Sequence, residues 1–178
     1  MASTSSVQFT SLAAAPGRSC GTCTLCCKVF DVPALEKPAG QWCRHCKPGV
    51  GCGIHQTRPQ HCREFFCLWM SDATLPAEWK PERSKIVLTH FPGNGFLYAQ
   101  VDPGSPQAWR KQPYYDQLRA WARRLNEQGG HVVVFVNDSA TLIMPDEAIA
   151  LGAMKPTDNF KIERSFGPKG ATYRVTRV

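Results

Sequence analysis

Long apolar runs are missing from this chain of 178 residues. Nowhere do about 18 apolar residues follow one another, as a membrane-spanning helix requires. The first residues also lack the basic region and the continuous apolar region of an export signal. We therefore expect a cytoplasmic protein with no membrane partner.

Motifs of several enzyme classes are missing as well. The sequence has no GxxxxGK[ST] phosphate loop, no HExxH metalloprotease motif and no GxSxG nucleophile elbow. Trp42-Cys43-Arg44-His45-Cys46 imitates the WCxxC of thioredoxins, but proline and glycine flank it where that motif needs a strand and a helix. The catalytic residues are unknown at this point, and a protein without catalytic activity is the favoured interpretation.

Cysteine is absent from residues 68–178, whereas nine cysteines lie between Cys20 and Cys67. In a reducing cytosol, clustered thiols serve metal binding or redox chemistry more often than structural disulfides. Thiolates are soft ligands that select zinc, copper(I) or iron–sulfur clusters over magnesium and calcium. The segregation of the thiols therefore favours a metal centre in the first half of the chain.

The spacing of the cysteines supports this interpretation. Cys20-x2-Cys23-x2-Cys26-Cys27 places four thiols within eight residues, and Cys43-x2-Cys46 repeats the two-residue step. Nine thiols exceed the four that one tetrahedral zinc or one four-iron cluster needs. The sequence therefore leaves open two metal centres or one centre with spare thiols, and His55 and His61 could complete a mixed site.

The same segment resembles a known family. The ordered combination of Cys20-x2-Cys23-x2-Cys26-Cys27 with Gly51-Cys52-Gly53-Ile54-His55 and Arg58-Pro59-x2-Cys62 is similar to the CxxCxxCC cysteine-cluster family, described as a zinc- or iron-chelating domain. The resemblance covers residues 20–67 and treats Cys46 as an addition. It implies a ligand role for eight residues: Cys20, Cys23, Cys26, Cys27, Cys43, Cys52, Cys62 and Cys67.

These observations predict a metal-binding protein that chelates zinc or iron through cysteine thiolates and has an accessory role in metal handling. An iron–sulfur cluster is slightly favoured over zinc, because the CxxCxxC triplet suits a four-iron cluster. The alternative is an iron–sulfur-dependent enzyme, a redox enzyme or a transferase, whose cluster is held by the same cysteines. The metal ion is the one partner that the sequence indicates.

Composition divides the chain into three parts. Residues 1–19 are rich in serine, threonine and alanine and predict a flexible tail with nothing to bury. Residues 20–70 predict a loop-rich module that bound metal organises, with one helix over residues 58–70 that carries Cys62 and Cys67 toward one side. Residues 71–178 predict a small α+β domain.

The pattern of residues 71–178 predicts a small antiparallel sheet with one long helix. Strands are expected at residues 84–91 and 95–101, joined by a turn at residues 92–94, and again at 131–136 and 140–144. The fully apolar run at 132–136 indicates a central strand. A helix is expected at residues 106–128, broken at Pro113 and stopped by two glycines, then a turn at 146–151 and weak strands at 160–163 and 171–175.

The chain has a formal charge of +7, from 21 Lys and Arg against 14 Asp and Glu. This charge alone would suggest a polyanionic partner, and five cations line the expected helix. Metal-bound cysteines are thiolates, however, which lowers the working charge to about +5 or +3. We therefore interpret much of the positive charge as balancing a metal–thiolate centre, and we do not expect a nucleic-acid partner.

Overall fold

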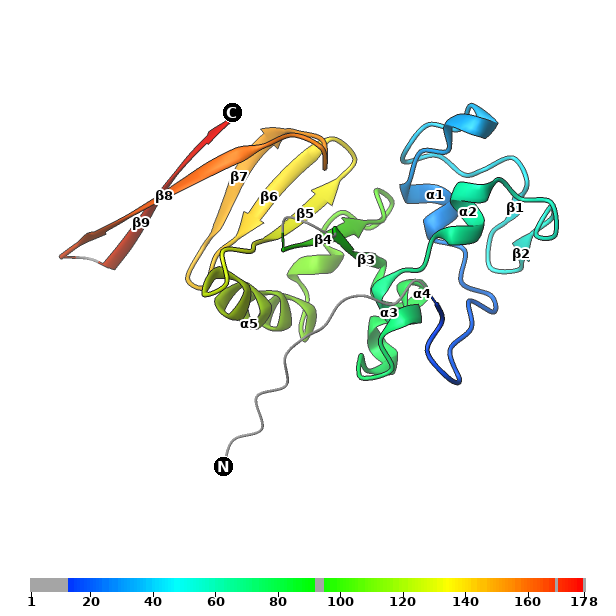
Figure 1. Cartoon of the computed structure of the whole chain (residues 1–178), viewed down its shortest axis with the longest axis horizontal. Helices are drawn as coiled ribbons and strands as arrows, with labels where there is room; N and C mark the ends of the chain where they lie inside the picture. Colours follow the sequence, from blue (N-terminus) through cyan, green and yellow to red (C-terminus); the bar gives the residue numbers. More distant parts are fainter. Residues whose placement is uncertain (1–12, 92–94, 169, 178) are drawn as a thin grey trace.

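A computed structural model describes residues 13–91, 95–168 and 170–177. It shows the predicted mixed α+β fold with one long helix. The cysteine-containing segment lies at one end, a five-stranded sheet with the long helix lies in the middle, and a β-hairpin lies at the other end (Figure 1).

The cysteine-containing segment, residues 20–71, consists of very short elements. Its regular pieces are α1 (Cys26–Val29), η1 (Pro33–Leu35), β1 (Cys46–Lys47), β2 (Gly51–Cys52), α2 (Gln60–Glu64) and α3 (Leu68–Ser71). The two β-strands pair with each other alone. Helices of four or five residues are not stable by themselves in water, so this segment depends on contacts or bound groups for its structure.

The single helix predicted over residues 58–70 is wrong. The chain is extended at Phe65 and again at Cys67, which separates α2 from α3. In one continuous helix, Cys62 and Cys67 would be turned about 140° away from each other. The extended break lets both cysteines reach the same cavity.

The central sheet runs in the order β3-β4-β5-β6-β7. Its strands are β3 (Ile86–Phe91), β4 (Phe96–Val101), β5 (Val132–Val136), β6 (Ser139–Ile143) and β7 (Ala148–Ala153). The hairpins β3–β4 and β5–β6 and the central position of β5 are confirmed. The turn predicted at residues 92–94 lies outside the described residues.

Two features of the sheet differ from the prediction. First, β4 and β5 are parallel, because α5 (Tyr114–Asn126) carries the chain back to the end of the sheet where β4 began. The sheet is therefore mixed and not purely antiparallel. Second, the turn predicted at residues 146–151 is largely strand β7, which pairs with β6 along a bulged register.

The long helix α5 begins after Pro113 and is preceded by η3 (Ala108–Arg110). Gly129 follows the helix with φ at +77°, a conformation that favours glycine. Leu118 and Ala122 are fully buried, and Trp121 and Leu125 pack beside them. The aromatic side chains thus belong to the core side of the helix, as the sequence indicates.

The sheet has a hydrophobic cluster on each face. One cluster joins the sheet and α5 to residues of the cysteine-containing segment, among them Leu25, Val29 and Leu68. The other lies around Tyr98 and Phe135 and is covered in part by the last hairpin. The cysteine-containing segment and the sheet therefore share a hydrophobic core.

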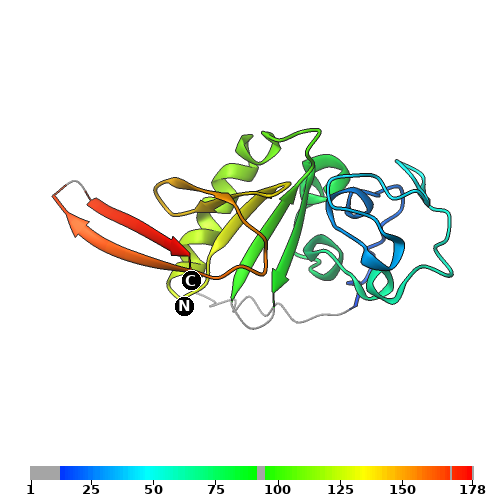
Figure 2. The ribbon, with the colours of Figure 1, turned by 90° about the horizontal axis from the view of Figure 1, so that it is seen from above.

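The last hairpin consists of β8 (Phe160–Gly167) and β9 (Gly170–Arg177). Both strands are longer than predicted, because each continues past the sheet (Figures 1 and 2). Ile162 and Tyr173 pack against the sheet at the base of the hairpin. Toward its tip, Phe166 is 75% exposed, with the Arg164 guanidinium 4.5 Å from its ring centre.

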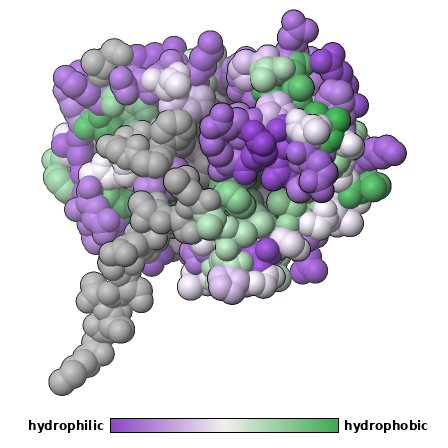
Figure 3. Space-filling model, turned by 45° about the vertical axis from the view of Figure 1, so that its right-hand side comes forward, coloured by the Kyte–Doolittle hydropathy of each residue, from purple (hydrophilic) through white to green (hydrophobic). Residues whose placement is uncertain are grey.

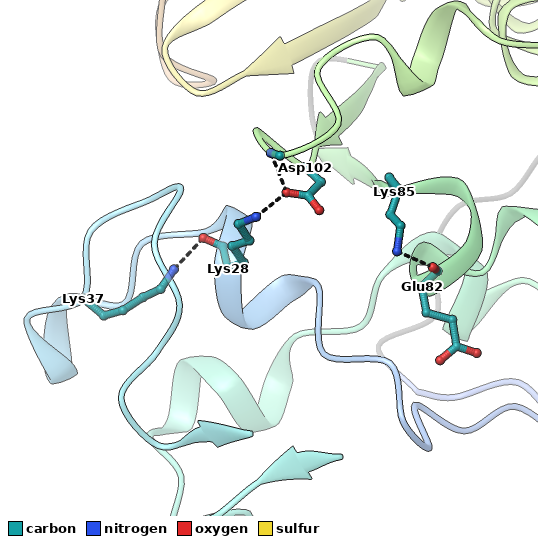
Figure 4. A network of polar contacts seen from close by, with 6 residues as sticks. Lys28, Lys37, Glu82, Lys85 and Asp102 are labelled. Carbon is teal, nitrogen blue, oxygen red and sulfur yellow. Dashed lines mark hydrogen bonds and ion pairs between the residues drawn. The ribbon is translucent and has the colours of Figure 1, made fainter. Parts of the chain in front are cut away.

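Polar contacts also attach the cysteine-containing segment to the sheet. Lys28 of α1 forms an ion pair of 2.6 Å with Asp102, which follows β4 (Figure 4). Nearby are η2 (Ala77–Trp79) and α4 (Pro81–Ser84), where Lys85 donates a hydrogen bond to the carbonyl of Glu82. Of these contacts, the Lys28–Asp102 ion pair joins α1 to the end of β4.

Part of the predicted flexible tail lies in the described residues. The Ala15 amide donates to the carbonyl of Met70 at 2.8 Å, and Arg18 donates to the carbonyls of Ala73 and Leu75. Arg18 also stacks over the ring of Trp69 at 4.1 Å. The prediction of a tail without contacts is therefore wrong for residues 13–19, and residues 1–12 lie outside the described part.

In the described part of the chain, no helix has the length and apolarity needed to cross a bilayer. This agrees with the absence of long apolar runs in the sequence. On the face shown in Figure 3, the visible described residues are largely hydrophilic, and hydrophobic side chains gather in small separate patches.

Candidate metal centre

One cavity of about 480 Å³ brings the predicted ligands together. Its lining includes all eight cysteines to which the family resemblance assigns a ligand role: Cys20, Cys23, Cys26, Cys27, Cys43, Cys52, Cys62 and Cys67. The ninth, Cys46, is not part of the lining. His55 and His61 also line the cavity, whereas His45 does not.

Short turns and helix ends position these thiols. Cys20 and Cys23 face each other across a turn closed by a 2.8 Å backbone hydrogen bond. Cys26 and Cys27 begin α1, and the amide of Cys43 donates to the carbonyl of Cys27 at 3.0 Å. The CxxC and CC spacings therefore bring neighbouring cysteines together through local turns. The backbone hydrogen bond between Cys43 and Cys27 connects the first four cysteines to the later ones.

All nine cysteines lie in the described residues and are free thiols. Hydrogen bonds link the side chain of Cys27 to those of Cys26 and Cys46. Cys46 is also opposite Cys52 in the β1–β2 ladder. Cys46 therefore neighbours Cys27 and Cys52 without lining the cavity, whereas Cys27 lines it and interacts with Cys20, Cys26 and Cys62.

Burial controls the protonation of the thiols. It raises the pKa of the Cys67 thiol to about 11 and also raises the pKa of Cys20, Cys23 and Cys62. For Cys27, the hydrogen bond with Cys26 and then burial raise the pKa. These thiols are neutral at pH 7, so a metal that binds them as thiolates must displace protons.

The thiols share a cavity, but they are not arranged as a finished coordination group. Within residues 13–91, 95–168 and 170–177, no three Cys, His, Asp or Glu side chains are placed so that they could hold one metal ion. The donors fit zinc or an iron–sulfur cluster in kind and in number. To hold one metal ion, the donors would have to lie closer together than they do in the described residues.

Two buried donor groups at the cavity lack a hydrogen-bond acceptor. In the described residues, Arg58 Nε and Trp69 Nε1 are buried without a partner, and both residues line the cavity. Both atoms can only donate. Buried donors without an acceptor are uncommon, so these two atoms mark the wall of the cavity as a place where the polar groups are not fully satisfied.

Positively charged side chains lie near the cysteines and can balance the negative charge of a metal–thiolate centre. Arg58 acts electrostatically to lower the pKa of Cys20 and Cys62, against the larger effect of burial. Lys37 is only 6% exposed; its ammonium group donates to the carbonyls of Lys28 and Phe30 and interacts electrostatically with Cys27 and Cys43. Burial lowers the pKa of Lys37, and electrostatic interaction with Cys27 and Cys43 acts against that effect.

Comparisons with protein-family models, with curated proteins and with solved structures found no match. The resemblance to the CxxCxxCC family therefore stays a prediction. The candidate centre rests on the residues of this chain alone.

Sequence reasoning identified the cysteines but missed the groups around them. Arg58 and Lys37 were only counted as cations, and Trp69 was only part of a predicted helix. The run Arg58-Pro59 was the available signal for Arg58, because Pro59 directly precedes α2 and both residues line the cavity. Nothing in the local sequence indicated that Lys37 is buried.

We expect the Arg58→Met variant to bind zinc about 10–100-fold more weakly, the usual effect of removing a residue that supports metal ligands. The variant loses both a cation and a buried donor at the cavity, whereas the change keeps most of the side-chain volume. Competition with a chromophoric chelator measures the affinity. Arg63→Met is the matched control, because Arg63 lies in α2, is exposed and does not line the cavity. Equal affinities for the two variants would contradict the role of Arg58.

Proposed function

We propose that this protein binds zinc or iron, with an iron–sulfur cluster slightly favoured, through thiolates of the cavity-lining cysteines. The observation that carries the proposal is the shared cavity. Eight cysteines chosen from sequence alone line one space of about 480 Å³, and the one cysteine left out of that set does not. Soft thiolate donors in this number suit zinc or iron–sulfur clusters.

The surroundings of the cavity support an anionic centre. A four-thiolate zinc site or a four-iron cluster carries a charge of about −2. Arg58 lines the cavity, and Lys37 interacts electrostatically with Cys27 and Cys43, so both cations can help to balance such a charge. The chain's own part is to hold the thiolates, exclude water and balance the charge.

Accessory metal handling without catalysis follows as the functional role. The sequence contains none of the catalytic motifs considered, and the described cysteines surround a largely apolar cavity between short loops. The absence of a finished coordination group in the described residues fits a site that closes as metal enters. Such a site is suited to taking up and releasing metal.

The test is purification without oxygen, followed by analysis of iron, acid-labile sulfide and zinc. We expect stoichiometric metal, with iron and sulfide in equal amounts for a cluster, or zinc without colour for a thiolate site. The slight preference for iron–sulfur is wrong if the protein is colourless and holds stoichiometric zinc. Protein that holds neither metal, and takes up neither from added zinc or from iron and sulfide, contradicts the proposal.

A further inference from the structure

A second cleft in the described residues is separate from the cysteine cavity. It has a volume of about 930 Å³, within the size range of sites for small organic molecules. It lies between the cysteine-containing segment and the sheet, with lining residues from α1, α2, β3, β4 and the segment after β7. Sites for small molecules often form where two structural units meet.

The lining combines an apolar interior with an acidic rim. Phe30, Phe65 and Phe66 are half-buried walls, and the ring of Phe30 lies 4.9 Å from that of Phe65. Tyr98 and Phe135, which belong to the other hydrophobic cluster, also line the cleft and are almost fully buried. Aromatic faces attract cations as well as apolar groups.

Three exposed carboxylates lie at the cleft: Asp31, Glu64 and Asp138. Lys155 is the one lysine or arginine that lines it. In the described residues none of these carboxylates forms an ion pair, and Glu64 only accepts a hydrogen bond from Gln60 at 2.6 Å. The lining therefore holds three carboxylates against one lysine on a chain whose formal charge is +7, and Asp31 also interacts electrostatically with the buried Lys37.

We propose that this cleft binds an organic amine, with the ammonium group among the carboxylates of Asp31, Glu64 and Asp138 and the apolar body against the phenylalanine rings. The overall positive charge of the chain would attract anions without specificity. A preference for a cation must therefore come from this local arrangement. The site goes beyond the proposed metal binding and does not require it.

The cleft and the cysteine cavity share a wall of four residues: Phe30, His61, Phe65 and Phe66. An amine in the cleft thus lies beside the candidate metal centre, with these side chains between them. The alternative function, an enzyme with a cysteine-bound cluster, would need a substrate site in this position.

The test compares two probes with the same apolar body and opposite charge. Isothermal titration calorimetry with the full chain measures the binding of tryptamine and of indole-3-propionate. We expect tryptamine to bind at least about tenfold more tightly, because each ion pair at the rim favours the cation. Equal binding, tighter binding of the anion, or no binding of tryptamine at millimolar concentration overturns the proposal.

Variants locate the binding. We expect the double variant Asp31→Asn/Asp138→Asn to reduce the preference for tryptamine about fivefold or more. We expect the same reduction from Ala39→Arg, because this change places a cation at the lining of the cleft. Glu127→Gln removes a carboxylate from the end of α5, away from the cleft, and should leave the binding unchanged. Metal analysis of the same samples separates failure of the cleft from failure of the metal site.

Discussion

The Cys27→Ser variant is expected to lose its metal entirely if there is one centre, or about half of it if there are two. Cys27 lines the cavity, hydrogen-bonds to Cys26 and Cys46, and interacts electrostatically with the thiols of Cys20 and Cys62. A serine hydroxyl is not ionised at pH 7 and is a much poorer ligand for zinc or iron than a thiolate. Metal analysis after purification without oxygen measures the loss.

Cys46→Ser is the matched control for this variant. Cys46 shares a hydrogen bond with Cys27 but does not line the cavity, so its replacement should leave the bound metal unchanged. An equal loss of metal in Cys27→Ser and Cys46→Ser would show that lining the cavity does not separate metal-binding cysteines from nearby cysteines. Full metal content in Cys27→Ser would remove Cys27 from the ligand set.

The second large effect is expected from removing the metal. Residues 40–62 contribute no side chain to either hydrophobic cluster among the described residues, and their regular elements have two to five residues. If the proposed metal binds, metal–thiolate bonds would be the main source of order in this segment. Chelation under reducing conditions should make amide hydrogen exchange in residues 40–62 at least about tenfold faster.

The central sheet provides the internal control for the exchange experiment. Val132, Val133 and Val134 of β5 are buried between two neighbouring strands and lie in the clusters on both faces. Their amide exchange should not change on chelation. Equal amide exchange in residues 40–62 with and without metal contradicts the claim that metal organises this segment. Faster exchange in β5 after chelation contradicts the claim that residues 40–62 lose their structure independently of the sheet.

The strands and the long helix could be predicted because their signals are local. Alternating or continuous apolar residues and turn residues identified β3 to β6, and periodic apolar positions identified α5. The strand β7 was missed because Asp146 and Glu147 suggested a turn, whereas pairing with β6 determines its structure. The parallel contact of β4 with β5 depends on the path of α5, which local patterns do not encode.

The candidate centre could also be predicted only in part from the sequence. Clustered thiols indicated a metal centre, and the family resemblance implied the set of eight cysteines and the exclusion of Cys46. The positions of Arg58 and Lys37 could not be predicted, because they result from the burial of loops distant in sequence. The cleft was missed for the same reason, since its walls come from segments between Val29 and Thr157.

X-ray absorption spectroscopy of the protein, purified without oxygen and with its native metal bound, tests the central claim most directly. The account predicts that sulfur dominates the first shell of ligands, at about 2.3 Å for zinc, with neighbouring iron atoms as well for an iron–sulfur cluster. A first shell made up mainly of nitrogen or oxygen, at about 2.0–2.2 Å, would contradict the assignment of the cavity cysteines as the metal ligands.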